Sequence, residues 1–137
     1  MNDHADHCAI TDVLVRYASG IDRRDWELFR TAFTPDCVLD YGQIGTWNGI
    51  DEVVAFMRMS HEGAGHTLHR LSNFAVDVDG DGANATTYVD ALVMAPDGAS
   101  GVNAIGFYED VLVRGDEGWR ISRRRFTTVR IAATNAS

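Results

Sequence analysis

The sequence predicts an α+β fold in which three N-terminal helices pack on one face of a curved antiparallel sheet. Two observations support this prediction. Apolar residues recur every three to four positions in the first half of the chain, and from residue 66 onward they alternate with polar ones. The 137 residues, of which 45% are hydrophobic, suffice for one compact domain and are too few for two ordinary ones.

Each predicted helix has its own local signals. The first covers residues 6–19, whose apolar side chains follow the spacing of one buried helix face: Ile10, Val13, Leu14, Tyr17 and Ala18. Gly20 is expected to end it. A second, short helix has Asp25 as its N-cap, carries aromatic residues as far as Phe33, and is stopped by Pro35. Asp51 is expected to cap the third helix.

The second half of the chain predicts strands joined by tight turns. A short strand over residues 37–41 and a loop over 42–49 precede the third helix. After residue 66, turns rich in aspartate and glycine separate four strands, at about residues 66–79, 83–95, 101–114 and 119–131. Four successive strands of this kind predict an antiparallel meander.

Composition and charge narrow the classes of partner. A net charge of −8 disfavours nucleic acid and anionic membrane, because both require a basic surface. No apolar run reaches the length of a membrane helix and the N-terminus lacks a signal-peptide pattern, so a cytoplasmic protein is expected. The absence of lysine excludes Schiff-base chemistry. A small-molecule substrate handled without a cofactor fits these limits.

Two polar stretches carry the candidate chemistry. His66 and His69 lie in a polar segment that also contains Asn73, and histidine exchanges protons near neutral pH. Asp22 lies between the first two predicted helices, where a buried carboxylate would need a cationic or hydrogen-bonding partner. A histidine could be that partner. Spacing of three between the histidines suits a metal site on a helix, not on a strand, so no metal site is predicted.

Several motifs lie in the same order as in a known family: Tyr17-x4-Asp22-x-Arg24-Asp25-Trp26, Phe33-Thr34-Pro35-Asp36, Asp40-Tyr41, Gly49 and His69-x3-Asn73. Through them the chain resembles the SnoaL-like branch of the nuclear transport factor 2-like superfamily. The resemblance extends from about residue 9 to residue 131 and implies a single domain over 1–137. The fold it implies is a cone, in which a strongly curved antiparallel sheet wraps around three N-terminal helices and an apolar pocket opens at the wide end.

Within that superfamily the motifs are most similar to those of scytalone dehydratases and hexachlorocyclohexane dehydrochlorinases. Both pair an aspartate after the first helix with a histidine of a His-x3-Asn stretch, which implies the pair Asp22 and His69 here. The tyrosine near the first strand, which binds a substrate oxygen in the dehydratase, matches Tyr41. The chain departs from the pattern at Ile21, where the dehydratase has tyrosine. It also lacks the dehydrochlorinase lysine and a later second histidine.

The resemblance implies a cofactor-independent proton-transfer enzyme. The expected reaction is a lyase reaction of the dehydratase type on a small apolar oxygenated or polyketide-like molecule. In this scheme His69 is the base, Asp22 orients its imidazole, and Tyr41 donates a hydrogen bond to the developing oxyanion.

Further residues are expected to line the pocket and bind the substrate: Tyr17, Tyr88, Asn103 and His66. Two alternatives remain open. Asp22 could itself be the base of a ketosteroid-isomerase-like isomerase or polyketide cyclase, or the domain could bind a small molecule without catalysis. Apolar strand surface and the family resemblance both favour a homo-oligomer, a dimer or a trimer.

Overall fold

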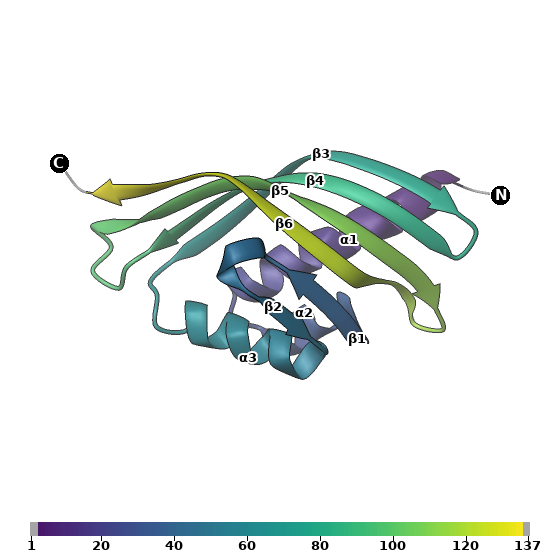
Figure 1. Ribbon diagram of the computed structural model, residues 1–137, viewed down its shortest axis with the longest axis horizontal. Helices are drawn as coiled ribbons and strands as arrows, with labels where there is room; N and C mark the ends of the chain where they lie inside the picture. The colour runs from purple at the N-terminus through teal and green to yellow at the C-terminus, as the bar shows by residue number, and fades with distance from the viewer. Residues whose placement is uncertain (1–2, 136–137) are drawn as a thin grey trace.

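The computed structural model describes residues 3–135 and shows a long, curved sheet arched over three helices (Figure 1). The helices are α1 (Asp3–Asp22), α2 (Trp26–Arg30) and α3 (Ile50–His61), and a single 3₁₀ turn, η1, covers Gly42–Ile44. The strands are β1 (Phe33–Asp40), β2 (Thr46–Asn48), β3 (Thr67–Asp79), β4 (Gly82–Met94), β5 (Ser100–Gly115) and β6 (Gly118–Asn135). The predicted α+β class is confirmed.

The six strands form one sheet in the order β2-β1-β6-β5-β4-β3. The last four strands make the predicted antiparallel meander. The structure differs at the other edge, where β1 is longer than expected and runs parallel to β6, and where the expected loop contains β2. Pro35 does not interrupt β1, because it lies where the register between Phe33 and Val38 shifts and no regular ladder is required.

The helix boundaries also differ from the sequence prediction. Gly20 lies inside α1, where an added Cβ would approach the backbone of Phe29 to 2.8 Å. The absence of a side chain at Gly20 therefore lets α2 pack closely against α1. α2 ends at Arg30, with Asp25 as its N-cap accepting a hydrogen bond from the backbone of Leu28. Gly49, not Asp51, is the N-cap of α3. No helix within residues 3–135 combines the length and apolar character needed to cross a membrane.

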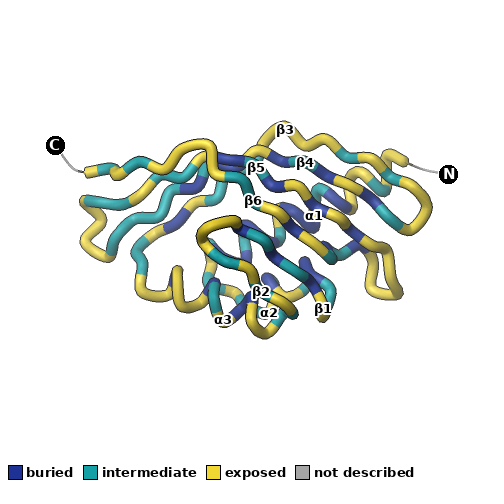
Figure 2. Tube along the Cα trace, viewed as in Figure 1, coloured by how far each residue is buried: buried dark blue, intermediate teal, exposed yellow. Residues whose placement is uncertain are grey.

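The core lies between α1 and the concave face of the sheet, where Figure 2 shows buried segments on both. The sheet register defines which side chains share that face. His69 on β3 is opposite Ala91 on β4, Ala91 is opposite Ala104 on β5, and Ala104 is opposite Ile131 on β6. Because side chains alternate across a strand, this row identifies the inner face at the wide end of the sheet.

Candidate active site

Asp22 and His69 meet at the point where α1 ends beneath β3. Oδ1 of Asp22 lies 2.8 Å from Nδ1 of His69, and Oδ2 accepts the backbone N–H of the same residue at 2.8 Å. The His69 side chain is 6% exposed and that of Asp22 is 18% exposed. One carboxylate therefore holds both the backbone and the ring of His69, which fixes the orientation of the imidazole.

Two further residues hold the carboxylate in place. The hydroxyl of Thr67 donates a hydrogen bond to Oδ1 of Asp22 at 2.9 Å. Arg24 donates to that hydroxyl at 2.9 Å, and also to the backbone oxygens of Ile21 and Gly65. Because Thr67 accepts from Arg24, its own proton is directed to Asp22. Arg24 thus links the end of α1 to the start of β3.

The charge of Asp22 determines which nitrogen of His69 carries the proton. Burial opposes ionisation of the carboxyl, but the hydrogen bonds from the ring and backbone of His69, the attraction to that ring and the bond from Thr67 together lower the pKa of Asp22. The carboxylate is therefore ionised at neutral pH and only accepts hydrogen bonds. In the neutral imidazole Nδ1 must be the donor, which leaves Nε2 with a free lone pair.

Tyr17 connects this dyad with a buried group of tyrosines. Its ring meets that of His69 edge to face, with centroids 6.2 Å apart. Its hydroxyl lies 3.0 Å from that of Tyr41 and 3.2 Å from that of Tyr108. Burial, reinforced by the neighbouring Tyr17, raises the pKa of Tyr41, so its phenol keeps its proton at neutral pH. Tyr41 therefore lies one tyrosine away from the dyad.

A buried ion pair lies under the tyrosine group. Arg124 makes a two-pronged contact with the carboxylate of Asp110, at 2.7 and 2.9 Å, and both side chains are at most 1% exposed. The guanidinium carbon is 4.1 Å from the ring centre of Tyr17 and 3.8 Å from that of Tyr108. The pair thus places a permanent positive charge against the ring that contacts His69.

Two expected binding residues lie on the opposite face of the sheet. Tyr88 is three positions before Ala91 and 52% exposed, so alternation turns it outward. Asn103 precedes the inward Ala104 and donates a hydrogen bond at 2.7 Å to Asp90. The expectation that these two side chains line the pocket with His69 is therefore corrected.

The remaining polar residues of the first candidate stretch have different environments. His66 is exposed, just before β3, and its backbone oxygen accepts a hydrogen bond from Met94. Asn73 has a positive φ of 54° at the irregularity of β3 between Ser72 and Ala75. Asparagine tolerates this conformation better than most residues, so it accommodates the bend of the strand.

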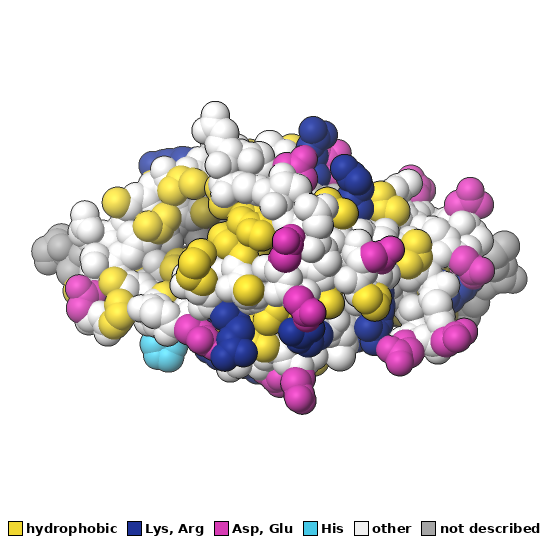
Figure 3. All heavy atoms as spheres, turned by 60° about the horizontal axis from the view of Figure 1, so that its bottom comes forward, with side chains coloured by type: hydrophobic (Ala, Val, Ile, Leu, Met, Phe, Trp, Pro, Cys, Tyr) yellow, Lys and Arg dark blue, Asp and Glu magenta, His cyan; other side chains and the backbone are white. Residues whose placement is uncertain are grey.

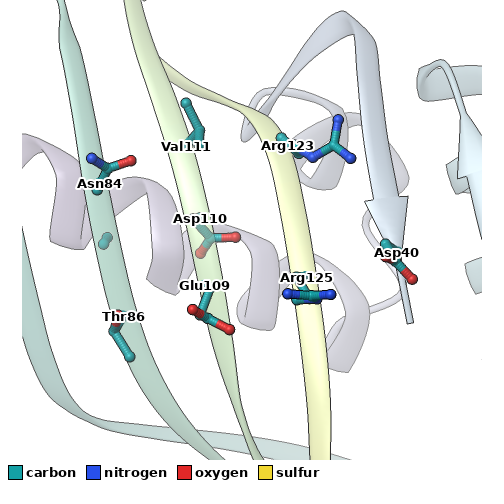
Figure 4. Close-up of a pocket in the computed structure, with 9 residues that line it drawn as sticks. Asp40, Asn84, Thr86, Glu109, Asp110, Val111, Arg123 and Arg125 are labelled. Atoms are coloured by element: carbon teal, nitrogen blue, oxygen red, sulfur yellow. The ribbon is translucent and has the colours of Figure 1, made fainter. Parts of the chain in front are cut away.

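The hollows of the surface distinguish the two faces. Figure 3 shows apolar side chains gathered on the side that carries the helices. A hollow of about 530 Å³ on this side lies between η1 and β6, lined among others by Tyr41, Ile44, Phe126 and Ile131. Figure 4 shows another, of about 420 Å³, lined mostly by polar side chains, among them Glu109, Arg123 and Arg125. Neither hollow is lined by Asp22 or His69. The hollow beside η1 is the better candidate for a substrate entrance, because it reaches Tyr41, which is joined to the dyad through Tyr17.

Sequence reasoning missed Arg24, Thr67 and the ion pair. Thr67 could have been found, since it lies two positions before His69 on the same strand and so shares its face. The roles of Arg24 and of Asp110 with Arg124 depend on contacts between distant segments. Those contacts follow from the sheet register, which no local pattern specifies.

Comparison with known proteins places this geometry in a family. A model of the SnoaL-like domain matches residues 3–125. The Mycobacterium tuberculosis protein Rv2910c, itself uncharacterized, is 33% identical over 122 residues, which cover 88% of this chain and 83% of the relative.

Three solved structures have the same fold. A "putative aromatic ring hydroxylase" of Novosphingobium aromaticivorans is 28% identical, with a TM-score of 0.89 and coverage of 98% of this chain and 96% of that one. A "putative scytalone dehydratase" of the same species is 23% identical, with a TM-score of 0.87 and coverage of 98% and 94%. A hexachlorocyclohexane dehydrochlorinase of Novosphingobium barchaimii is 19% identical, with a TM-score of 0.85 and coverage of 96% and 91%. The chain therefore belongs to the SnoaL-like domain family.

Proposed function

We propose that this protein is a cofactor-independent lyase that eliminates water, or another small leaving group, from a small, mostly apolar oxygenated molecule. The observation that carries the proposal is the two-point contact of Asp22 with His69, at 2.8 Å for both the ring and the backbone nitrogen. The names of two proteins with the same fold, a dehydratase and a dehydrochlorinase, support the reaction class.

The proposed reaction uses His69 first as a base and then as an acid. Nε2 takes a proton from a carbon next to a carbonyl, and the electron pair of the broken C–H bond forms the new C=C bond. The bond from the neighbouring carbon to its hydroxyl breaks, and the imidazolium returns its proton to that oxygen, so that water leaves. A positioned group of this kind contributes roughly 10²- to 10⁴-fold to the rate.

The surroundings favour the imidazolium that forms in this step. Asp22 is an ionised partner at hydrogen-bond distance. The carboxyl end of α1, which is 20 residues long, also lies at the dyad, and a helix C-terminus stabilises a nearby cation by about 0.3–1 kcal/mol. Both oxygens of Asp22 are already engaged by His69 and Thr67, which favours His69 over Asp22 as the base.

The test is a screen of β-hydroxy ketones in deuterated water, followed by NMR. The expected result is exchange of the acidic C–H for C–D and appearance of the unsaturated ketone. His69→Gln and Asp22→Asn should each slow both processes by roughly 10²- to 10⁴-fold. Arg70→Gln is the matched control, because Arg70 is the next residue on β3 and its side chain pairs with Asp90. Unchanged rates in both dyad variants would show that the protein does not use this mechanism.

The oligomeric state stays a prediction. Apolar side chains on the outer face are partly exposed, among them Ile105, Val111 and Val129. We propose that they contribute to a homodimer or homotrimer. Light scattering coupled to size exclusion at micromolar concentration tests this, and a strict monomer would contradict it.

A further inference from the structure

His61 lies beside the dyad, although the proposed mechanism does not use it. It is the last residue of α3 and is only 9% exposed. Its ring centre is 5.6 Å from that of His69, and the two rings are inclined at 46°. Two imidazoles from different elements, α3 and β3, therefore lie next to each other in a nearly closed environment.

The contacts of His61 fix its tautomer. Nδ1 is 2.9 Å from the backbone oxygen of Met57 and 3.0 Å from the hydroxyl of Ser60. That hydroxyl donates its own proton to the backbone oxygen of Phe56. A carbonyl oxygen only accepts, so Nδ1 of His61 must carry the proton. Nε2 of His61 is then a bare acceptor.

The charge state of His61 agrees with this tautomer. Burial is the largest cause that lowers its pKa, and the charges of His69 and Arg24 lower it further. The Met57 carbonyl and the Asp22 carboxylate oppose them, and the resulting pKa is about 4. The ring is therefore neutral at pH 7 and cannot donate a proton from Nε2.

Two free lone pairs thus belong to neighbouring rings, whose centres are 5.6 Å apart. Asp22 engages Nδ1 of His69, which leaves its Nε2 free in the same way. Within residues 3–135 neither Nε2 has a hydrogen-bond partner, and both side chains are nearly buried. A nearly buried acceptor favours a ligand that brings a donor.

We propose that His61 is a substrate-binding residue of this site, whose Nε2 accepts a hydrogen bond from a hydroxyl group while Nε2 of His69 takes a proton from a neighbouring carbon. The inference rests on the function proposed above and narrows its substrate class. An acceptor makes the hydroxyl it binds a poorer leaving group, so this hydroxyl is one that the product keeps. The substrate therefore carries a donor hydroxyl in addition to the group that leaves.

The test compares two probes of nearly equal shape, 4-hydroxyacetophenone and 4-methoxyacetophenone, of which only the first has a donor. Dissociation constants are measured by NMR titration. Wild-type protein should bind the hydroxyl probe at least about tenfold more tightly, as expected for a buried acceptor that the ether leaves unpaired. His61→Phe should bind both probes equally. His61→Gln, which keeps an acceptor near the position of Nε2, should retain part of the preference.

The matched control is His7→Phe, which changes an exposed histidine of α1 and should keep the full preference. Long-range 1H–15N spectra provide a second readout: His61 should have its proton on Nδ1, and the hydroxyl probe should shift the Nε2 resonance of His61. Equal binding of both probes by wild-type protein, no binding of either, or a proton on Nε2 would overturn the proposal. These binding measurements do not depend on turnover, so a failure of the lyase proposal, seen as unchanged rates in His69→Gln, is distinguishable from a failure of this one.

Discussion

Two carboxylates of this protein each face a nitrogen base, and they differ in what that base can do. Asp110 is completely buried and is paired with Arg124, which keeps its charge at any accessible pH. Asp22 is partly open and is paired with His69, whose imidazole can accept or donate a proton. The first pair holds a constant charge, whereas the second can exchange a proton.

Tyr17 belongs to both regions. Its ring lies against the guanidinium of Arg124 and also meets the ring of His69 in a T-shaped contact. The pair of Asp110 and Arg124 is thus part of the framework that positions the pair of Asp22 and His69. Depth of burial alone therefore does not enable proton exchange, since the deeper pair is the one whose charge is fixed.

The largest expected effect comes from breaking the buried pair. Arg124→Met leaves Asp110 buried without a partner and should lower the free energy of unfolding by about 3–5 kcal/mol, measured by urea denaturation. The double variant Arg124→Met with Asp110→Leu removes both charges and should recover much of this loss. If the double variant is no more stable than the single one, the unpaired charge is not the cause.

The next effect concerns pH and His61, whose pKa in the folded protein is about 4. The unfolded chain takes up a proton below about pH 6.5 and the folded one only near pH 4, so acid favours unfolding. The contribution of the neutral His61 ring to the free energy of unfolding is fully present above pH 6.5. It should decrease by about 3 kcal/mol between pH 6.5 and pH 4. Asp22, with its lowered pKa, titrates below this window.

Urea denaturation at several pH values between 4 and 7 measures how the free energy of unfolding depends on pH. His61→Phe should remove this pH dependence, while His7→Phe, a change at an exposed histidine, should keep it. The same slope in wild type and His61→Phe would mean that another group is responsible.

A smaller effect is expected for the hydroxyl between Arg24 and Asp22. Thr67→Val keeps the shape and deletes both hydrogen bonds of that hydroxyl, and should cost about 1–3 kcal/mol of unfolding free energy. The pKa of Asp22 should rise, because one of the bonds that lower it is lost. Thr67→Ser keeps the hydroxyl and should preserve that pKa, read from the carboxyl resonance by NMR. An unchanged pKa of Asp22 in Thr67→Val would show that the Thr67 hydroxyl does not stabilise the carboxylate.

The smallest effect is expected for an ion pair on the outer face. Arg70 and Asp90 are 2.8 Å apart, but both are solvent-exposed. Arg70→Ala should change the free energy of unfolding by less than about 1 kcal/mol, and salt should reduce even that. A loss as large as that of Arg124→Met would contradict the link between burial and the cost of breaking a pair.

Local patterns predicted the fold class, and the family resemblance supplied the pair Asp22 and His69, but neither gave the whole site. The change of period at residue 66 indicated helices followed by strands, and the motif spacing brought Asp22 and His69 to attention. The errors arise where long-range pairing decides. Asn103 is polar among apolar neighbours, but its face depends on the register that places Ala104 in the row of His69. Tyr88 was misplaced for the same reason.

The residues that were missed have a common physical cause. Arg24 reaches β3 from a backbone with a positive φ of 55°, a conformation that its sequence neighbours do not signal. No local pattern singles out His61, because its nearness to His69 depends on how α3 packs. Contacts between side chains of different helices and strands can be identified only once the tertiary structure is known.

The 20 residues of α1 fix the direction in which each side chain points around the helix axis, as well as the length of the helix. The face that buries Ile10, Leu14 and Tyr17 also determines the direction in which Asp22 leaves the end of the helix. Deleting one residue from the middle of α1 would turn everything beyond it by about 100° and shift it by about 1.5 Å. Such a deletion would disturb the core and the dyad together. In this helix, insertions and deletions are therefore tolerated far less than substitutions, and the phase of the core protects the position of the carboxylate.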